Sequence, residues 1–436
     1  MSSENLQYDD NELFSFKSES NTDDDVLATY VITTPVDGER AALGIAREQS
    51  VCATRLNGVE MPRDVGDYCA RVVAVEALPA KPQGMAALYF LNTTVYGSGS
   101  PDRELGQFKV VIAYPVNLFG HSLTRLWNSV FGEIHRLGYL SAAVLTDIRL
   151  PPLLTEAYPG PKFGVAGIRE KLGVWGRPVF CRSMRPASSL NTDTMLQINE
   201  SVLSGGFDVI KDDELTYDCQ RSPFADRVRR MVDMKHRIED QTGERKLYFA
   251  NVIDDYSRSL EMVEQSAAFG ADGVLLSTTA QGLSFIGEVA SRTELIILSH
   301  NSCGDVITRT SAWGASNAVM AKLQRAAGAD LVVSPGPFAT TYQDAAEAQA
   351  FLESCHDRLG RCEAILPIIQ GGKQPGEIAQ YTADVGSTDY MLIAATWLDN
   401  HPDGIKAGAR AFRDAWDVIA WNGNQPKETP SDHKNV

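Results

Sequence analysis

The feature that most constrains the fold is a strand-then-helix pattern that repeats eight times between about residues 151 and 421. Amphipathic stretches such as FADRVRRMVDMKHRIEDQ separate consecutive apolar segments. Because such helices cover both faces of a sheet, the pattern indicates parallel βα units. No GxGxxG motif follows the first strand, so the alternative of a doubly wound dinucleotide-binding sheet has no support. Eight units predict a (β/α)8 TIM barrel, an α/β fold with strands at 178–184, 207–211, 246–252, 273–278, 294–299, 330–334, 364–369 and 390–394.

The chain before this repeat, from about residue 26 to 150, has a different pattern. Strand candidates lie at 27–34, 71–78 and 108–116, and helical stretches lie at 37–50 and 122–137. This order predicts an α+β domain, ferredoxin-like in type, with an antiparallel sheet. Residues 1–25 and 422–436 are polar, and we expect the first of these tails to be disordered.

Charge and cysteine usage narrow the classes of function. With 40 basic and 56 acidic residues the net charge is −16, which disfavours nucleic acid or an anionic membrane as the main partner. The seven cysteines are scattered without a CxxC pair, which is typical of reduced thiols in a cytoplasmic protein. The acidic N-terminus does not resemble a signal peptide, and no apolar run approaches the ~18 residues of a membrane span.

The most informative stretch is FDVIKDDE, at the end of the second predicted barrel strand. Alternation puts Lys211 and Asp213 on one face, and Glu214 follows as the loop begins. In a barrel of this kind, chemistry is located at the carboxyl ends of the strands. If CO₂ converts the lysine amine to a carbamate, the three groups suit Mg²⁺, which prefers oxygen ligands. The local alternative is a solvated acidic turn with a salt-bridged Lys211, and the local sequence alone favours that alternative.

The wider sequence around this motif resembles the large chain of RuBisCO. The resemblance rests on GGFDVIKDDE (205–214) and YPGPKFGVAGIREKLGVWGRP (158–178), and it extends over roughly 26–420. It implies a carbamylated Lys211 that binds Mg²⁺ together with Asp213 and Glu214. It also implies a homodimer in which the N-terminal domain of one subunit covers the barrel mouth of the other.

Four further positions match functional residues of that family. Glu48 matches an active-site glutamate, and His300 matches a histidine that follows the fifth barrel strand. Gly371 and Gly372 match a glycine pair whose backbone N–H groups hold a substrate phosphate.

Other positions depart from the carboxylase pattern. Arg185 stands where carboxylases have an acid/base lysine, and arginine stays protonated, so it can stabilise an enolate but cannot abstract a proton. The remaining replaced positions are Ser129, Ala187, Asn301, Gly304, Val333, Ala394 and Ala395, and Thr340 lies nearest to the missing loop lysine. The chain therefore resembles a RuBisCO-like protein (form IV), and SHNSCGDVITR is similar to the subgroup that acts on 3-oxo-isoapionate 4-phosphate.

These observations predict a Mg²⁺-dependent enzyme that forms an enolate or enediolate from a phosphorylated keto-sugar or keto-acid. We expect Arg185, His300 and Glu48 to move or stabilise charge. Decarboxylation is preferred over isomerisation, because it generates the enolate without proton abstraction. The alternatives are an enolase or isomerase of methionine salvage and a catalytically impaired regulatory protein.

Overall fold

The computed structural model describes residues 13–15, 22–52, 64–79, 104–309, 312–334 and 345–421. Most of the predicted N-terminal tail, the predicted C-terminal tail and Thr340 lie outside these ranges. The chain divides into two compact units. Unit 1 contains Met1–Tyr158, Gly304–Leu323 and Leu359–Arg361, and unit 2 contains Pro159–Cys303, Gln324–Arg358 and Cys362–Val436.

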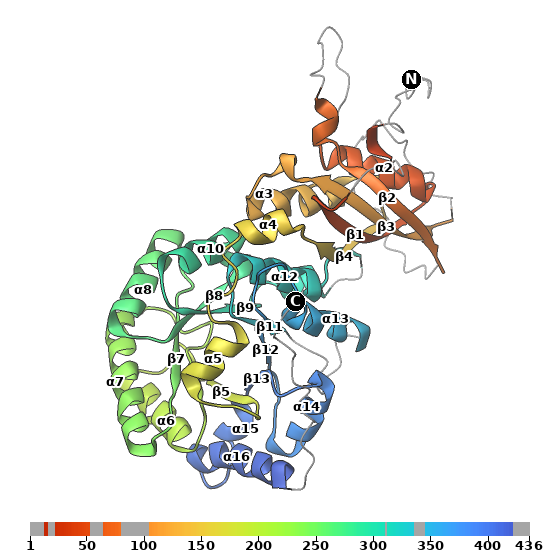
Figure 1. The fold of residues 1–436 in the computed structure, drawn as a ribbon. Coiled ribbons are helices and arrows are strands. Elements are labelled where there is room, and N and C mark those ends of the chain that lie inside the picture. The colour runs from red at the N-terminus through yellow and green to blue at the C-terminus, as the bar shows by residue number, and fades with distance from the viewer. Residues whose placement is uncertain are drawn as a thin grey trace. The chain divides into compact units, whose positions relative to one another are not determined.

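Unit 2 is built on the predicted closed barrel of eight strands (Figure 1). Neighbouring strands are parallel, and their order around the barrel is β5-β6-β7-β8-β9-β11-β12-β13. The strands are β5 (Val179–Ser183), β6 (Val209–Lys211), β7 (Leu247–Asn251), β8 (Gly273–Ser277), β9 (Ile296–His300), β11 (Leu331–Ser334), β12 (Leu366–Ile369) and β13 (Met391–Ile393). All eight predicted strand segments are therefore confirmed.

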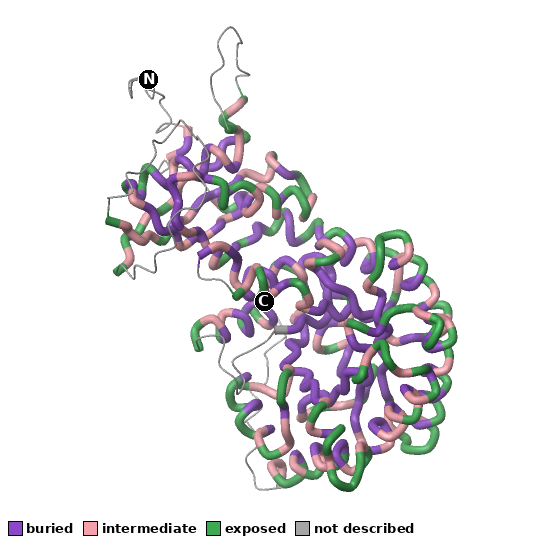
Figure 2. Tube along the Cα trace, turned by 180° about the vertical axis from the view of Figure 1, so that it is seen from behind, coloured by how far each residue is buried: buried purple, intermediate pink, exposed green. Residues whose placement is uncertain are grey.

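Helices surround this barrel, and the strands form its buried core (Figure 2). Apolar side chains of the strands, such as Phe249, Leu298 and Ile368, pack in one interior cluster. The helices are α5 (Gly164–Leu172), α6 (Thr192–Ser204), α7 (Phe224–Thr242), α8 (Tyr256–Phe269), α9 (Thr278–Gln281), α10 (Leu283–Arg292), α12 (Asn317–Ala327, of which the part up to Leu323 belongs to unit 1), α13 (Ala345–His356), η6 (Pro375–Glu377), α14 (Ile378–Val385), α15 (Thr396–Asp399) and α16 (Ile405–Trp421). Gly270 ends α8 with a φ of 84°, a left-handed conformation that glycine adopts without a Cβ penalty.

A Gly-X-Asp pattern recurs immediately before three barrel strands, ending at Asp208, Asp272 and Asp330. Each aspartate forms a reciprocal pair with one residue of the neighbouring strand. Its backbone N–H donates to that residue's carbonyl, and its carboxylate accepts from that residue's N–H at 2.9 Å. The partners are Phe180, Tyr248 and Ile297. These pairs fix the register of three strand pairs at the amino end of the barrel.

Unit 1 contains a five-stranded sheet with the order β10-β4-β1-β3-β2. Its strands are β1 (Asp25–Thr34), β2 (Arg71–Leu78), β3 (Gly106–Pro115), β4 (Ala142–Arg149) and β10 (Trp313–Ala315). The pairs among β1, β2 and β3 are antiparallel, as predicted. β4, which was not among the predicted strands, pairs with β1 antiparallel and with β10 in parallel. The sheet therefore includes a strand from the part of the chain that follows barrel strand β9, which the sequence pattern did not predict.

Two helices were predicted in unit 1, over 37–50 and 122–137, and the structure agrees with the first but not fully with the second. The first predicted helix is α2 (Gly38–Glu48), but the one expected over 122–137 is broken into α3 (Leu123–Trp127), the π-helical turn η4 (Asn128–Gly132) and η5 (Ile134–Arg136). A Cβ at Gly132 would lie 2.7 Å from the Asn128 side-chain oxygen, so the turn closes against a glycine. Short helices complete the unit at η2 (Val65–Tyr68), η3 (Val116–Leu118), α4 (Pro152–Ala157) and α11 (Asp305–Thr308).

The described residues also bear on the expectations about the N-terminal tail, the cysteines and membrane-spanning segments. Phe14, within the predicted N-terminal tail, is fully buried, and the adjacent Ser15 forms a bridge with Val72. All seven cysteines are free thiols. Among the described residues, no helix has the length and apolar character needed to cross a membrane.

Candidate active site

Lys211, Asp213 and Glu214 meet at the carboxyl end of β6. Lys211 and Asp213 are each only 1% exposed, which rules out a fully solvated turn. The Lys211 ammonium donates to the Asp212 carbonyl at 3.2 Å and lies 3.5 Å from Oε2 of Glu214. The sequence motif therefore places a buried amine beside a carboxylate.

Asp212 lies between Lys211 and Asp213 in the sequence, but its side chain points to the opposite side of β6 and connects the strand to helix α7. Its Oδ2 accepts from Nε of the fully buried Arg227 of α7 at 3.1 Å, and its Oδ1 accepts from the Tyr248 hydroxyl at 3.2 Å. The alternation of a strand thus turns Lys211 and Asp213 to one side and Asp212 to the other.

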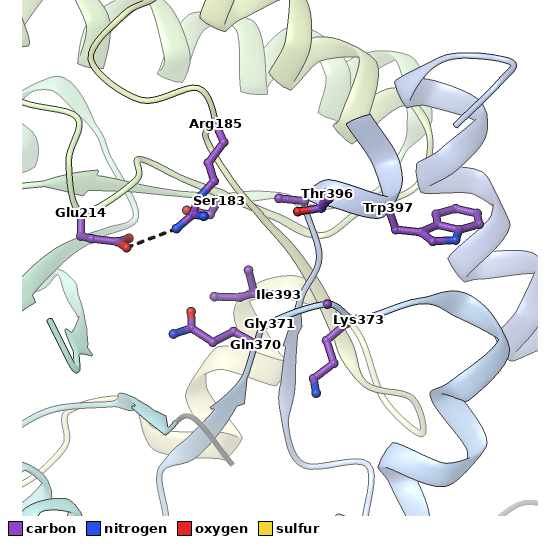
Figure 3. A pocket seen from close by; sticks show the side chains of 11 residues that line it. Ser183, Arg185, Glu214, Gln370, Gly371, Lys373, Ile393, Thr396 and Trp397 are labelled. Atoms are coloured by element: carbon purple, nitrogen blue, oxygen red, sulfur yellow. Dashed lines mark hydrogen bonds and ion pairs between the residues drawn. The ribbon is translucent and has the colours of Figure 1, made fainter. Parts of the chain in front are cut away.

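Arg185, just after β5, contacts both carboxylates of the motif. Its Nε lies 2.8 Å from Oδ2 of Asp213. Its Nη2 lies 3.4 Å from Oε1 of Glu214, the contact that Figure 3 draws as a dashed line. The Ser183 hydroxyl also donates to Oδ2 of Asp213, at 3.1 Å. The hydrogen bond to Asp213 raises the pKa of Arg185, so this guanidinium remains a cation.

His300, the last residue of β9, faces the same carboxylates. Its Nδ1 accepts the backbone N–H of Ser302 at 3.0 Å, and its Nε2 lies 3.4 Å from Oε2 of Glu214. Burial, together with the charge of Lys211, lowers the pKa of His300 to about 3. The neutral ring therefore carries its proton on Nε2, which makes His300 a hydrogen-bond donor toward this site and a poor base.

A cavity of about 180 Å³ adjoins Arg185 and Glu214 (Figure 3). It is lined by Ser183, Arg185, Glu214, Gln370, Gly371, Gly372, Lys373, Ile393, Ala395, Thr396 and Trp397. Gly371 and Gly372 both have positive φ, at 85° and 61°, and no atom lies within 4 Å of a Cβ built on either. Their backbone is therefore open to the close approach of a ligand.

Lys373, in the same cavity lining, is a residue that sequence reasoning missed. It is 3% exposed, its ammonium lies 4.8 Å from the centre of the Tyr381 ring, and burial lowers the pKa of Lys373 to about 8. Figure 3 shows its side chain extending away from Arg185 and Glu214. The available signal was a lysine directly after the glycine pair of IIQGGKQPGE.

Family models for both parts of the RuBisCO large chain match this sequence. The catalytic-domain model matches residues 164–436, and the N-terminal-domain model matches residues 14–154. The chain belongs to the RuBisCO large-chain family.

Individual members of the RuBisCO large-chain family are similar over most of the chain. Ribulose bisphosphate carboxylase-like protein 2 of Rhodopseudomonas palustris is 29% identical over 388 residues, 88% of this chain and 87% of that protein. The 2,3-diketo-5-methylthiopentyl-1-phosphate enolase of Exiguobacterium sibiricum is 30% identical over 318 residues, 72% of this chain and 78% of that protein. The crystal structure of the octameric Rubisco of Pyrococcus horikoshii, 26% identical, has a TM-score of 0.83 and covers 94% of this chain and 91% of that chain.

Glu48, Asn301 and Val333, which the family resemblance also pointed to, lie in different surroundings. Glu48, the last residue of α2, lies in unit 1, where burial raises its pKa and Arg47 lies 3.7 Å away. Asn301 accepts a long hydrogen bond of 3.4 Å from Gln370. Val333 is part of the barrel core, so it contributes packing where the carboxylase pattern has a histidine.

The donor chemistry at β6 fits a divalent cation on one condition. The described residues contain no cluster of three or more His, Cys, Asp or Glu side chains that could hold a metal ion. Asp213 and Glu214 supply two carboxylates, and a third anionic oxygen ligand arises only if Lys211 is converted to a carbamate. Because the Lys211 amine already lies beside Glu214, that conversion would place the new oxygens next to an existing carboxylate.

Proposed function

We propose that this RuBisCO-family chain is a Mg²⁺-dependent enzyme that forms an enolate or enediolate from a phosphorylated keto-sugar or keto-acid and does not fix CO₂. The observation that carries the proposal is the meeting of Lys211, Asp213 and Glu214 beside a cavity that has an open glycine pair. The relative from Exiguobacterium, named for a phosphorylated diketone, supports this class of substrate.

The metal site requires a covalent change at Lys211. Its neutral amine forms an N–C bond to CO₂ and loses a proton, which leaves an anionic carbamate. That carbamate, Asp213 and Glu214 would hold the ion, and a bound Mg²⁺ supplies Lewis-acid stabilisation of a developing enolate. The backbone N–H groups of Gly371 and Gly372 are the proposed partners of the substrate phosphate.

C–C cleavage is the reaction that these side chains support best. Arg185 stays protonated, and His300 presents an N–H, so neither removes a proton from carbon. In a decarboxylation the C–C bond breaks, its electron pair remains as the enolate, and CO₂ leaves. His300 then donates a hydrogen bond to an enolate oxygen, and the positive charge of Arg185 stabilises the enolate.

A proton-abstracting enolase is the second candidate, and Lys373 is the observation that favours it. An amine with a pKa lowered to about 8 is partly neutral near physiological pH, as a general base must be. It would have to leave the Tyr381 ring to reach a substrate at Glu214. Incubation with 2,3-diketo-5-methylthiopentyl 1-phosphate in D₂O separates the two, because only the enolase would exchange a substrate proton and lose that exchange in Lys373→Met.

The metal site is tested directly with bicarbonate and Mg²⁺. We expect intact-protein and peptide mass spectrometry to find one CO₂ on Lys211, and calorimetry to show Mg²⁺ binding that Lys211→Ala abolishes. Two carboxylates alone make a poor site for this ion. The exposed Lys406→Ala is the control and should bind Mg²⁺ as the parent protein does. Unchanged affinity in Lys211→Ala would show that the metal site is misassigned.

The active assembly is proposed to be a cytoplasmic homodimer in which Glu48 of one subunit completes the site of the other. The octameric relative from Pyrococcus supports self-association. Light scattering of the purified chain should give at least twice the 47.6 kDa mass of one chain, and a monomer would contradict the shared site.

A further inference from the structure

The two carboxylates proposed as metal ligands already share one cationic partner. Arg185 places Nε 2.8 Å from Asp213 and Nη2 3.4 Å from Glu214, so a single guanidinium spans both groups. Oδ2 of Asp213 also accepts from Ser183, and its Oδ1 accepts the backbone N–H of Leu215 at 3.1 Å. The oxygens that a metal ion needs are therefore engaged.

Charge compensation explains why a guanidinium is held here. Asp213 is almost completely buried, and a buried carboxylate without a counter-charge is strongly destabilising. A divalent cation would provide the same compensation, but it would repel a guanidinium held against the same oxygens. Arg185 and a divalent cation are consequently alternative partners for Asp213 and Glu214.

The structure also provides a place for the displaced guanidinium. The Arg185 side chain is 56% exposed, so more than half of its surface faces solvent and is not packed against other protein atoms. It lines the cavity that contains Gly371 and Gly372 (Figure 3). Among the cavity-lining residues, Gln370 and Thr396 are neutral, and the Lys373 side chain extends away from Arg185 and Glu214. A guanidinium turned inward would therefore add a second positive charge to the lining, on the side where the cavity has none besides Arg185 itself.

We propose that Arg185 couples the two halves of the site: its guanidinium leaves Asp213 and Glu214 when a divalent cation binds there, and it then becomes a ligand for the anionic group of the substrate. The inference rests on the metal site of the proposed function. Because such coupling is reciprocal, the cation strengthens anion binding and the anion strengthens cation binding by the same factor.

The first test measures Mg²⁺ affinity by calorimetry in bicarbonate buffer. Arg185→Met removes the competing guanidinium, so we expect Mg²⁺ to bind about tenfold more tightly than to the parent protein. Arg221→Met is the matched control, because it removes the same charge from the loop after β6, where Arg221 donates to the Ser189 carbonyl. Its Mg²⁺ affinity should stay within about twofold of the parent value.

The outcomes of this test separate the two proposals. Equal Mg²⁺ affinity in the parent protein and Arg185→Met would overturn the role of Arg185 and leave the metal site in place. No binding to either protein would overturn the metal site and the coupling together. Equal tightening in Arg221→Met would assign the effect to net charge and would also overturn the displacement.

The second test uses inorganic phosphate as the anion. In the parent protein, saturating Mg²⁺ should tighten phosphate binding by about tenfold, whereas Arg185→Met should bind phosphate more weakly and show little effect of Mg²⁺. Pairing of Mg²⁺ with phosphate in solution is the same for both proteins, so the difference between them isolates the side chain. An equal Mg²⁺ effect in both proteins would overturn the coupling.

Discussion

The charged side chains at the barrel mouth contact either carboxylates or an aromatic ring. Lys211 lies beside Glu214, Arg185 spans two carboxylates, and Lys373 lies over the ring of Tyr381. A ring face stabilises a cation less than a carboxylate does in the same surroundings. Burial therefore shifts the pKa of Lys373 downward. The pKa of Arg185 shifts upward, because Arg185 donates a hydrogen bond to Asp213.

Lys373 should titrate far below an ordinary lysine. We expect a midpoint near pH 8 in the ¹³C NMR spectrum of the reductively methylated protein, in a signal that Lys373→Met lacks. Because the pKa of Lys373 falls from 10.5 to about 8 on folding, the folded chain binds fewer protons between these values. The contribution of this lysine to stability therefore rises with pH across that window, and Lys373→Met should lack the rise. A midpoint near 10.5 would contradict the burial of its ammonium.

At the scale of single elements, β6 depends on an ion pair on the side facing away from the site. Asp212 and Arg227 are both fully buried and connect the strand to α7. The pair also positions the motif, because Asp212 lies between Lys211 and Asp213. Removal of one member of a buried pair leaves the other charge without compensation.

Arg227→Ala should therefore lower the free energy of unfolding by about 3–5 kcal/mol, measured by urea denaturation. Arg230→Ala, on the same helix, is the control. Arg230 pairs with Asp193 and Asp226 at the surface, so its loss should cost less than about 1 kcal/mol. Similar losses in the two variants would show that the Asp212 pair does not anchor the strand.

Patterns within single elements decided what the sequence could predict. The barrel strands are short apolar segments between helices, and all eight were found. In β4, the buried residues Ala143, Leu145 and Ile148 break the two-residue period because pairing with β1 shifts between Thr29 and Tyr30. Because of this irregularity, the sequence of β4 does not show the alternation by which a strand is recognised. β10 has only three residues, too few for any period to appear.

The candidate site was predictable in part for a related reason. Lys211, Asp213 and Glu214 are adjacent in sequence, so the motif and its family resemblance pointed to them directly. The contact of Arg185 with Asp213 arises because β5 and β6 are neighbouring strands. Lys373 reaches the same cavity because barrel closure pairs β13 with β5 and so brings the end of β12 close to them. Both kinds of proximity depend on how the strands assemble in three dimensions, which leaves no local signal in the sequence.

At the scale of the whole molecule, the two units do not correspond to two consecutive stretches of chain. Residues Gly304–Leu323 leave the barrel sequence after β9 and belong to unit 1. There β10 covers the edge of β4, and Ser316 donates its backbone N–H to the Leu145 carbonyl at 2.9 Å. Lys322 adds an ion pair with Asp147.

Ser316→Pro removes that N–H, so the β4 edge should open more often. Hydrogen exchange followed by mass spectrometry should show about tenfold faster exchange in the peptide containing Ala143 and Leu145, as expected for one lost hydrogen bond. Peptides of β6 and β7 in the other unit serve as the internal control. Unchanged exchange across β4 would mean that β10 does not protect this edge.

The origin of β10 also has a consequence for synthesis on the ribosome. The N-terminal sheet is translated first, but its edge strand β4 lacks its last partner until the chain has been made as far as Ala315, after barrel strand β9. An uncovered strand edge is a template for pairing with other chains. The nascent protein therefore exposes such an edge while much of the barrel is being translated, and this interval is when we expect chaperones to matter most for its yield.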